Sequence, residues 1–473
     1  MRKLFTRDNQ FYRTFFKLYI ALVLQNVVTI SVNLVDNVML GAYSETALSG
    51  VAVVNQIQFV YQQVLMALGD GLVMFSSQYW GDRQTGPIKR IAAIAMKAGL
   101  CAAVLLFGAI SLLPGPIAGL FTTDVMIIDE AVKYMQIIRF SYFFFAVTIL
   151  LLATMRSVET VKIALYLSIL AFCINCGINY VLIYGRFGMP QMGVQGAAIG
   201  TLSARIVECA VCIWYVAVKD KKLHMRLKDY FAGIDWKLGK EYFKVTLPVL
   251  VVQALWGLNT ALQTVILGHM TAAAIAANSM ASTLFMLVKS MAVGASATAS
   301  VIIGKTIGEG NLAKVKEYAK TLQILFVIIG IVAGCILFMI RVPVLALYDL
   351  SADTKAMANA FLIILSVTCM TMSYQMPTNC GIIKGGGSPM YVVKLDLISI
   401  WCIVLPISFF MAFVVEASPI VVVCCLNADQ VFKCVPAFIK VRTWKKKYLP
   451  LLIFWNSVIQ MPCVRCTMRK IMN

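Results

Sequence analysis

Long apolar segments separated by short polar loops dominate the pattern along the chain. A helix needs about 20 predominantly apolar residues to cross a bilayer. The sequence holds twelve segments of this kind. The pattern therefore predicts an all-α membrane protein whose twelve transmembrane helices lie at residues 16–40, 48–78, 91–113, 131–153, 163–184, 194–218, 245–268, 274–303, 321–340, 356–382, 395–415 and 418–438.

The composition agrees with this prediction. The chain of 473 residues is 60% hydrophobic and only 13% charged, whereas soluble domains usually carry about a quarter charged residues. The net charge is +20, but the basic residues form short clusters between apolar segments, so we do not expect nucleic-acid binding. The 14 cysteines show no regular spacing, which argues against a disulfide scaffold, and we predict no metal site.

Lysine and arginine alternate between the two sides of the predicted membrane. The loop at residues 42–47 has no basic residue, whereas the linker at residues 219–244 is strongly basic. Because basic loops stay in the cytoplasm, we expect both termini and this linker there. The N-terminal segment lacks a cleavage site, so we interpret it as the first transmembrane helix of a multi-pass protein. We expect this protein in the plasma membrane, which in a bacterium is the inner or cell membrane.

The chain also contains an internal repeat. The segment DNVMLGAYSETAL from Asp36 matches QTVILGHMTAAAI from Gln263, and Gly41 pairs with Gly268 at an offset of 227 residues (268 − 41). We predict two pseudo-symmetric lobes of six helices, related by an axis along the membrane normal, with a ligand path between them. The expected division is an N-lobe at 1–218, a cytoplasmic linker at 219–244, a C-lobe at 245–440 and an atypical C-terminal tail at 441–473.

Asp36 is the candidate site for a coupling cation. A charged carboxylate inside a spanning helix costs about 2.5–3.5 kcal/mol, so it is functional by default. Gln25, Thr29 and Asn33 fall on the same helix face and are candidates to line a cavity. The simpler alternative is that Asp36 is a solvated residue near the end of its helix.

Amide side chains supply further candidates. The second predicted helix carries Asn55, Gln56 and Gln62 together with Tyr61. Asn175 and Asn179 lie one turn apart on the fifth, and with Asp36 they can form a polar site. Amides can coordinate Na⁺ or bind a drug, but they can also serve only to hold helices together.

Four further polar positions lie within the predicted spans, and two of them are interpreted as structural. Arg205 and Glu208, at i and i+3, are expected to form a structural ion pair. Gln263 stands at the repeat position of Asp36, and Lys289 at that of Gln62 (289 − 227 = 62). Both are cavity candidates of the C-lobe, although Lys289 can instead pair inside the lobe or extend to its surface.

Three further acids lie within the predicted spans. Asp70 is either a member of a proton relay or a residue that faces the cytoplasmic crevice. Asp396 lies near the cytoplasmic end of the eleventh predicted helix, and Asp429 and Lys433, at i and i+4 of the twelfth, are expected to pair.

Six segments resemble the multidrug and toxin extrusion (MATE) family of transporters, collinearly from about residue 10 to residue 442. They are LQNVVTISVNLVDNVMLG, SSQYWGD, GMPQMGVQGAAIGT, TLPVLVVQALWGLNTALQTVILG, VIIGKTIGEGN and LDLISIWCIVLP. The resemblance implies the MATE fold, prokaryotic type, and a coupling and binding role for the acid at Asp36. Some members carry an Asp where this chain has Asn179, and others an essential Glu in the seventh helix, where residues 253–260 hold no acid.

The resemblance implies a secondary-active exporter. It would exchange organic cations or amphipathic drugs for H⁺ or Na⁺ by alternating access, as a monomer in the lipid bilayer and without a cofactor other than the coupling ion. One alternative is a lipid-linked saccharide flippase of the same superfamily, which should have more cationic cavity residues. The remote alternative is an intramembrane enzyme, but no HExxH, GxSxG or nucleotide-binding GxxxxGK[ST] motif is present.

Overall fold

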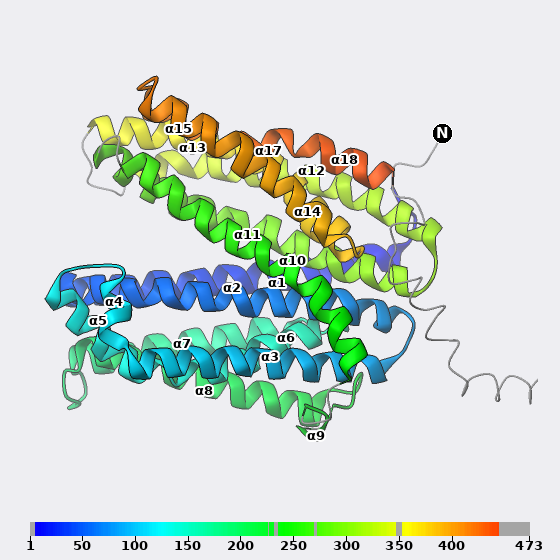
Figure 1. Ribbon diagram of the computed structural model, residues 1–473, viewed down its shortest axis with the longest axis horizontal. Coiled ribbons are helices and arrows are strands. Elements are labelled where there is room, and N and C mark those ends of the chain that lie inside the picture. The colour runs from blue at the N-terminus through cyan, green and yellow to red at the C-terminus, as the bar shows by residue number, and fades with distance from the viewer. Residues whose placement is uncertain (1–4, 226, 231–234, 269–271, 347–351, 444–473) are drawn as a thin grey trace, which may run out of the picture.

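The computed structural model describes residues 5–225, 227–230, 235–268, 272–346 and 352–443. Two bundles of helices lie side by side along the long axis of the molecule (Figure 1). We call the first bundle the N-lobe; it contains α1 (Asn9–Tyr43), α2 (Glu45–Gly81), α3 (Thr85–Leu112), α4 (Pro114–Gly119), α5 (Val125–Ile138), α6 (Ser141–Ser157), α7 (Lys162–Tyr184), α8 (Gly193–Trp214) and the π-helical η1 (Tyr215–Lys219). A short α9 (Leu227–Tyr230) follows in the linker.

The second bundle, the C-lobe, begins with α10 (Trp236–Gly268), which starts near α9 and crosses into the second bundle (Figure 1). The other elements are α11 (Ala272–Gly308), α12 (Leu312–Ala346), α13 (Ala352–Met376), η2 (Pro377–Ile383), α14 (Pro389–Asp396), η3 (Leu397–Val404), α15 (Leu405–Phe413), α16 (Pro419–Leu426), α17 (Asp429–Phe432) and α18 (Cys434–Arg442). The tail beyond residue 443 lies outside the described residues, and the predicted boundaries between the lobes and the linker stay a prediction.

Local sequence sets several helix ends. The Asp8 carboxylate accepts hydrogen bonds from the backbone N–H groups of Gln10 and Phe11, at 2.9 and 3.4 Å, and so caps the start of α1. Ser44 separates α1 from α2, and its hydroxyl accepts from the Ala47 N–H at 3.3 Å. Gly185 ends α7 in the left-handed region, at a φ of 65°, where a side chain would be strained.

Every predicted span corresponds to helical structure, although not always to one straight helix. Within the described residues, ten helices are long and apolar enough to cross a membrane, or eleven if the bent pair α5 and α6 counts as one span. This pair meets at 58°. The seventh predicted span coincides with α10, which is not among the ten. The prediction of an all-α membrane protein is confirmed.

The C-lobe departs most from the predicted straight helices. The tenth span ends in the π-helical η2, and the eleventh contains the π-helical η3 between α14 and α15. The twelfth span is divided into α16, α17 and α18. A period-3.6 pattern predicts a helix but does not report such local changes in winding, which frequently mark functional positions.

The two lobes diverge toward the end that carries α4 and α5 and approach each other toward the end that carries α9 (Figure 1). We call these ends the α5 end and the α9 end. One cluster of buried apolar residues contains members of both lobes, such as Leu72 of α2, Ile302 of α11 and Ile382 of η2. A second cluster, including Phe361 of α13, consists of C-lobe residues alone. Of these two clusters, the first joins the lobes into one core.

Glycines let the helices of the two lobes touch at the α9 end. A β-carbon on Gly81 of α2 would overlap the backbone carbonyl of Lys305, and one on Gly308 of α11 would overlap the carbonyl of Gln78. A β-carbon on Gly304 would overlap the Ser77 hydroxyl. The close contact of α2 with α11 therefore requires residues without side chains at these positions.

We predict that Gly308→Ala forces α2 and α11 apart. Overpacking of this kind costs about 1–3 kcal/mol, so the variant should unfold at a lower temperature in detergent than the wild type. Gly108→Ala is the matched control, because a β-carbon on Gly108 has no neighbour within 4 Å. Equal unfolding temperatures for the two variants would contradict the tight contact.

Candidate functional site

Asp36 of α1 lies against α7 inside the N-lobe. The side-chain amide of Asn179 donates a hydrogen bond to the Asp36 carboxylate at 2.8 Å. Asn179 is fully buried, and Asp36 is partly buried. A charged acceptor strengthens such a bond, so the carboxylate is held in a defined orientation.

The polar contacts continue along α7 and into α8. The same Asn179 amide reaches the Asn175 side-chain oxygen at 3.4 Å, and Asn175 donates to the Thr201 hydroxyl at 3.2 Å. A β-carbon on Gly200 would overlap the Asn179 side-chain oxygen, so α8 approaches α7 closely here. The structure thus joins Asp36, Asn175 and Asn179, which the sequence proposed as one polar site, and adds Thr201.

Arg205 and Glu208 form an ion pair on α8, with 2.8 Å between the guanidinium and the carboxylate. The guanidinium also stacks over the Phe145 ring, 4.4 Å from its centroid. The charge of Arg205 also favours the ionised form of Asp36, but its ion pair is with Glu208. Within the described residues, no basic side chain forms an ion pair with Asp36.

The other polar residues predicted on α1 do not join this network. Asn33 is exposed. The Thr29 hydroxyl, also exposed, donates to the backbone carbonyl of Gln25 on its own helix at 2.9 Å. In the part of the chain that the structure describes, none of the three is hydrogen-bonded to the Asp36 side chain.

The candidates on α2 occupy different environments. Asn55 and Gln56 are exposed, and Gln62 is partly buried. Tyr61 is only 5% exposed, and its hydroxyl donates to the Tyr142 carbonyl at 2.9 Å, so it packs inside the N-lobe.

The C-lobe candidates lie on α10 and α11. Gln263 is partly buried. The Lys289 ammonium lies 4.5 Å from the centroid of the Trp256 ring, and this ring lies 5.9 Å from that of Phe59 in the N-lobe. Lys289 is therefore close to the junction of the lobes, in a cation–π contact.

An open apolar pocket of about 440 Å³ belongs to the C-lobe, and none of its lining residues is among the predicted site residues. It is lined by Leu262, Trp401, Leu405, Pro406, Phe409, Phe410 and Val414.

Charged contacts between the lobes were missed by sequence reasoning. Asp70 of α2 forms ion pairs with Arg156 of its own lobe at 3.3 Å and with Lys384 of the C-lobe at 2.7 Å. Glu159, between α6 and α7, pairs with Lys305 of α11 at 2.9 Å. A single intramembrane acid such as Asp70 signals that a partner exists, but nothing in the sequence says which one.

The N-terminus adds two more contacts at the α9 end. The Tyr318 hydroxyl of α12 donates to the Asp8 carboxylate at 2.6 Å, and this bond lowers the pKa of Asp8 from its ordinary value. The backbone N–H of Thr6 donates to the Thr321 hydroxyl at 3.0 Å.

Among the described residues, no group of three or more His, Cys, Asp or Glu side chains is placed to hold a metal ion.

A carboxylate inside the spanning helices of a protein with two helical lobes is typical of a membrane transporter. A family model described as MatE matches residues 21–181 and 248–410, which is more than half of the chain. The chain therefore belongs to the MATE family of transporters and is not an enzyme. The family resemblance seen in the sequence is confirmed.

Relatives with similar sequences are named as multidrug resistance proteins. The chain is 24% identical over 388 residues to the probable multidrug resistance protein NorM of Thermotoga maritima, covering 82% of each chain. It is 22% identical over 410 residues to the multidrug resistance protein MdtK of Yersinia pseudotuberculosis, covering 84% of this chain and 87% of the relative.

Solved structures show the same fold. A multidrug resistance MATE family transporter of the MOP superfamily in an outward-facing conformation superimposes with a TM-score of 0.83 at 17% identity, covering 93% of this chain and 98% of the other. A mutant of the Vibrio cholerae MATE transporter VcmN gives a TM-score of 0.83 at 15% identity, with coverages of 92% and 96%.

We predict that Asn179→Leu impairs transport without preventing folding. It removes the donor to the Asp36 carboxylate, and an unpaired buried acceptor costs about 1–3 kcal/mol. Dye efflux from cells with equal amounts of protein should fall severalfold. Thr29→Val is the comparison, because its hydroxyl bonds only its own helix. If Thr29→Val lowers efflux as strongly, the site extends along α1 and is not confined to the Asp36–Asn179 contact.

Proposed function

We propose that this protein is a secondary-active multidrug exporter that exchanges organic cations or amphipathic drugs for H⁺ or Na⁺ by alternating access. Asp36 would be the coupling residue. The protein would act as a monomer in the bacterial cell membrane, with its termini and the α9 end in the cytoplasm. Relatives named as multidrug resistance proteins support the substrate class.

The observation that carries the proposal is the uncompensated charge of Asp36. Its network contains two carboxylates, Asp36 and Glu208, and one guanidinium, Arg205, which pairs with Glu208. The formal charge is −1 when both acids are ionised, and a proton, Na⁺ or a cationic drug would neutralise it. Competition for this one charge would couple the uptake of the ion to the release of the drug.

The contacts between the lobes support alternating access. The shared apolar core, the glycine contacts of α2 with α11 and the Glu159–Lys305 pair hold the lobes together at the α9 end. The lobes diverge at the α5 end (Figure 1). With basic loops in the cytoplasm, this arrangement is a state that is closed to the cytoplasm. The opposite state would require these contacts to separate.

The charge of the network also favours cationic substrates over a lipid-linked saccharide. A flippase of anionic lipid-linked sugars would need several cationic groups facing its ligand. Arg205 is already paired, so the N-lobe network presents a net negative charge.

Asp36→Asn tests the proposal. It keeps the size and the hydrogen-bonding capacity of the side chain but removes its charge, so we expect energised efflux of a cationic dye to be lost in membrane vesicles. Separate Na⁺ and pH gradients imposed on the wild type would identify the coupling ion.

Glu45→Gln is the matched control. It also converts an acid to an amide, but Glu45 is exposed in the first turn of α2. It should retain efflux. Full efflux by Asp36→Asn under either gradient would refute the assignment of Asp36.

The Glu159–Lys305 pair provides a test of alternating access. Lys305→Glu places a second carboxylate opposite Glu159, in place of the ammonium that lies 2.9 Å from it, and the repulsion of the two acids should disfavour the state closed at the α9 end and reduce efflux. The exchanged pair, Glu159→Lys with Lys305→Glu, should restore much of it. Lys314→Glu makes the same charge change at an exposed position of α12 and should have little effect. If the exchanged pair is no better than Lys305→Glu, the contact does not stabilise a transport state.

A further inference from the structure

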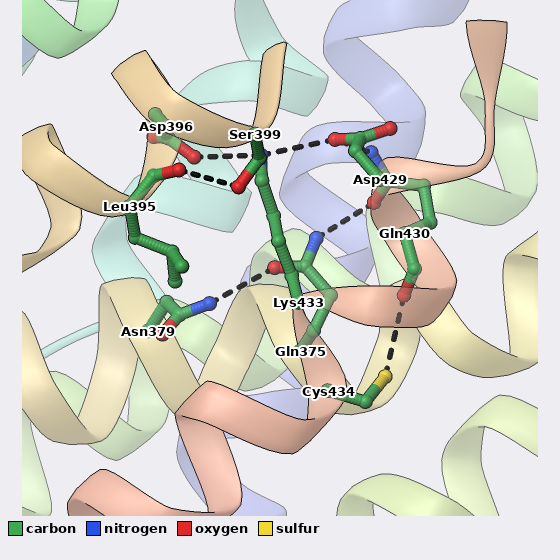
Figure 2. A network of polar contacts seen from close by, with 9 residues as sticks. All are labelled: Gln375, Asn379, Leu395, Asp396, Ser399, Asp429, Gln430, Lys433 and Cys434. Carbon is green, nitrogen blue, oxygen red and sulfur yellow. Dashed lines mark hydrogen bonds and ion pairs between the residues drawn. The ribbon is translucent and has the colours of Figure 1, made fainter. Parts of the chain in front are cut away.

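A charged network inside the C-lobe has no part in the proposed mechanism. Figure 2 shows the Lys433 side chain reaching between two carboxylates. Its ammonium lies 2.7 Å from Asp396 and 2.9 Å from Asp429. The side chains of Lys433 and Asp429 are 3% and 5% exposed. The ammonium thus takes the place of a cation between two buried anionic groups.

Amide groups extend the network away from the carboxylates. Gln430 donates to Asp429 at 2.8 Å, Gln375 donates to Gln430 at 2.6 Å, and Asn379 donates to the Gln375 oxygen at 3.0 Å (Figure 2). Asn379 is 3% exposed, and its own side-chain oxygen has no hydrogen-bond partner among the described residues. An unsatisfied buried oxygen at the end of this chain is a free ligand for a cation or for a donor.

The three helices that supply these side chains all change winding at the network. Asn379 lies in the π-helical η2, and the π-helical η3 begins directly after Asp396. Asp429 is the first residue of the short α17, and Lys433 separates α17 from α18. An ordinary ion pair between two helices needs no such interruption, whereas ion sites of membrane transporters are typically built from discontinuous helices.

Charge balance indicates what the site would hold. Asp396 and Asp429 supply two negative charges, and the Lys433 ammonium between them supplies one positive charge. Loss of Lys433 would leave both carboxylates without their monovalent counter-ion, among further amide oxygens. A single monovalent cation in the position of the ammonium would restore the charge that the network has now, whereas a divalent cation would change it.

We propose that this network is a monovalent-cation site whose cation is the protein's own Lys433 ammonium. With this tethered cation in place, the C-lobe is held permanently in its cation-bound arrangement and does not respond to free Na⁺. Removal of the ammonium uncovers a Na⁺ site formed by Asp396, Asp429 and the amide oxygens of the network. This inference concerns cation binding and does not depend on the proposed exporter function.

The test uses the full chain purified in detergent, with Na⁺ as the probe. Thermal unfolding of Lys433→Ala is measured in sodium chloride and in choline chloride at equal ionic strength, together with binding of radioactive Na⁺. We expect a saturable rise of several degrees in the unfolding temperature with Na⁺, because a ligand that binds only the folded state stabilises it. Adding Asp396→Asn to Lys433→Ala removes a ligand and one negative charge, and should return the Na⁺ response to that of the wild type.

Lys394→Ala is the matched control, since it removes an exposed ammonium two residues from Asp396. It should behave like the wild type. Lys433→Gln serves if Lys433→Ala gives no folded protein in choline, and folding of either variant in Na⁺ alone supports the site. The proposal is overturned if both variants show the wild-type Na⁺ response, or if neither folds even in Na⁺, because Lys433 would then be a structural partner that no free cation replaces.

Discussion

The hydrocarbon core of a bilayer offers charged groups neither water nor hydrogen-bond partners, so an intramembrane charge is stabilised chiefly by partners within the protein. This constraint organises the whole structure. Asp70 is held by one cation from each lobe, and Lys433 by two carboxylates of the C-lobe. Asp36 differs, because its bonded partner is the neutral amide of Asn179. Asp36 is therefore the one acid in this set without an ion pair, which is why the proposed mechanism assigns the coupling ion to it.

The two lobes share a sequence repeat but carry different charged side chains at equivalent positions. The N-lobe keeps an acid at Asp36 where the C-lobe has Gln263, and the C-lobe keeps an ammonium at Lys289 where the N-lobe has Gln62. The C-lobe carboxylates Asp396 and Asp429 share the Lys433 ammonium, whereas Asp36 has no ion pair among the described residues. In the proposed mechanism, this asymmetry would place ion exchange in the N-lobe and a more static role in the C-lobe.

Much of the fold could be predicted from the sequence. An apolar segment long enough to cross the bilayer can be recognised locally, and the repeat recurs at a constant offset. The Asp36–Asn179 contact could also be predicted from the sequence, because polar residues inside a membrane are stabilised by contact with one another. The pairs Asp70–Lys384 and Glu159–Lys305 could not be predicted, because they join residues 314 and 146 positions apart and depend on how the lobes dock. The π-helical segments were missed because a change in winding leaves the apolar pattern intact, and η3 contains neither Pro nor Gly.

The apolar core that both lobes share at the α9 end has a thermodynamic consequence. Separating the lobes there would expose buried side chains such as Leu72 and Ile302 to water. Exposure of apolar surface raises the heat capacity, so the enthalpy and entropy of opening both change with temperature. The balance between the two transport states would then be a curved function of temperature, and its position would follow the growth temperature of the cell as well as its ion gradients.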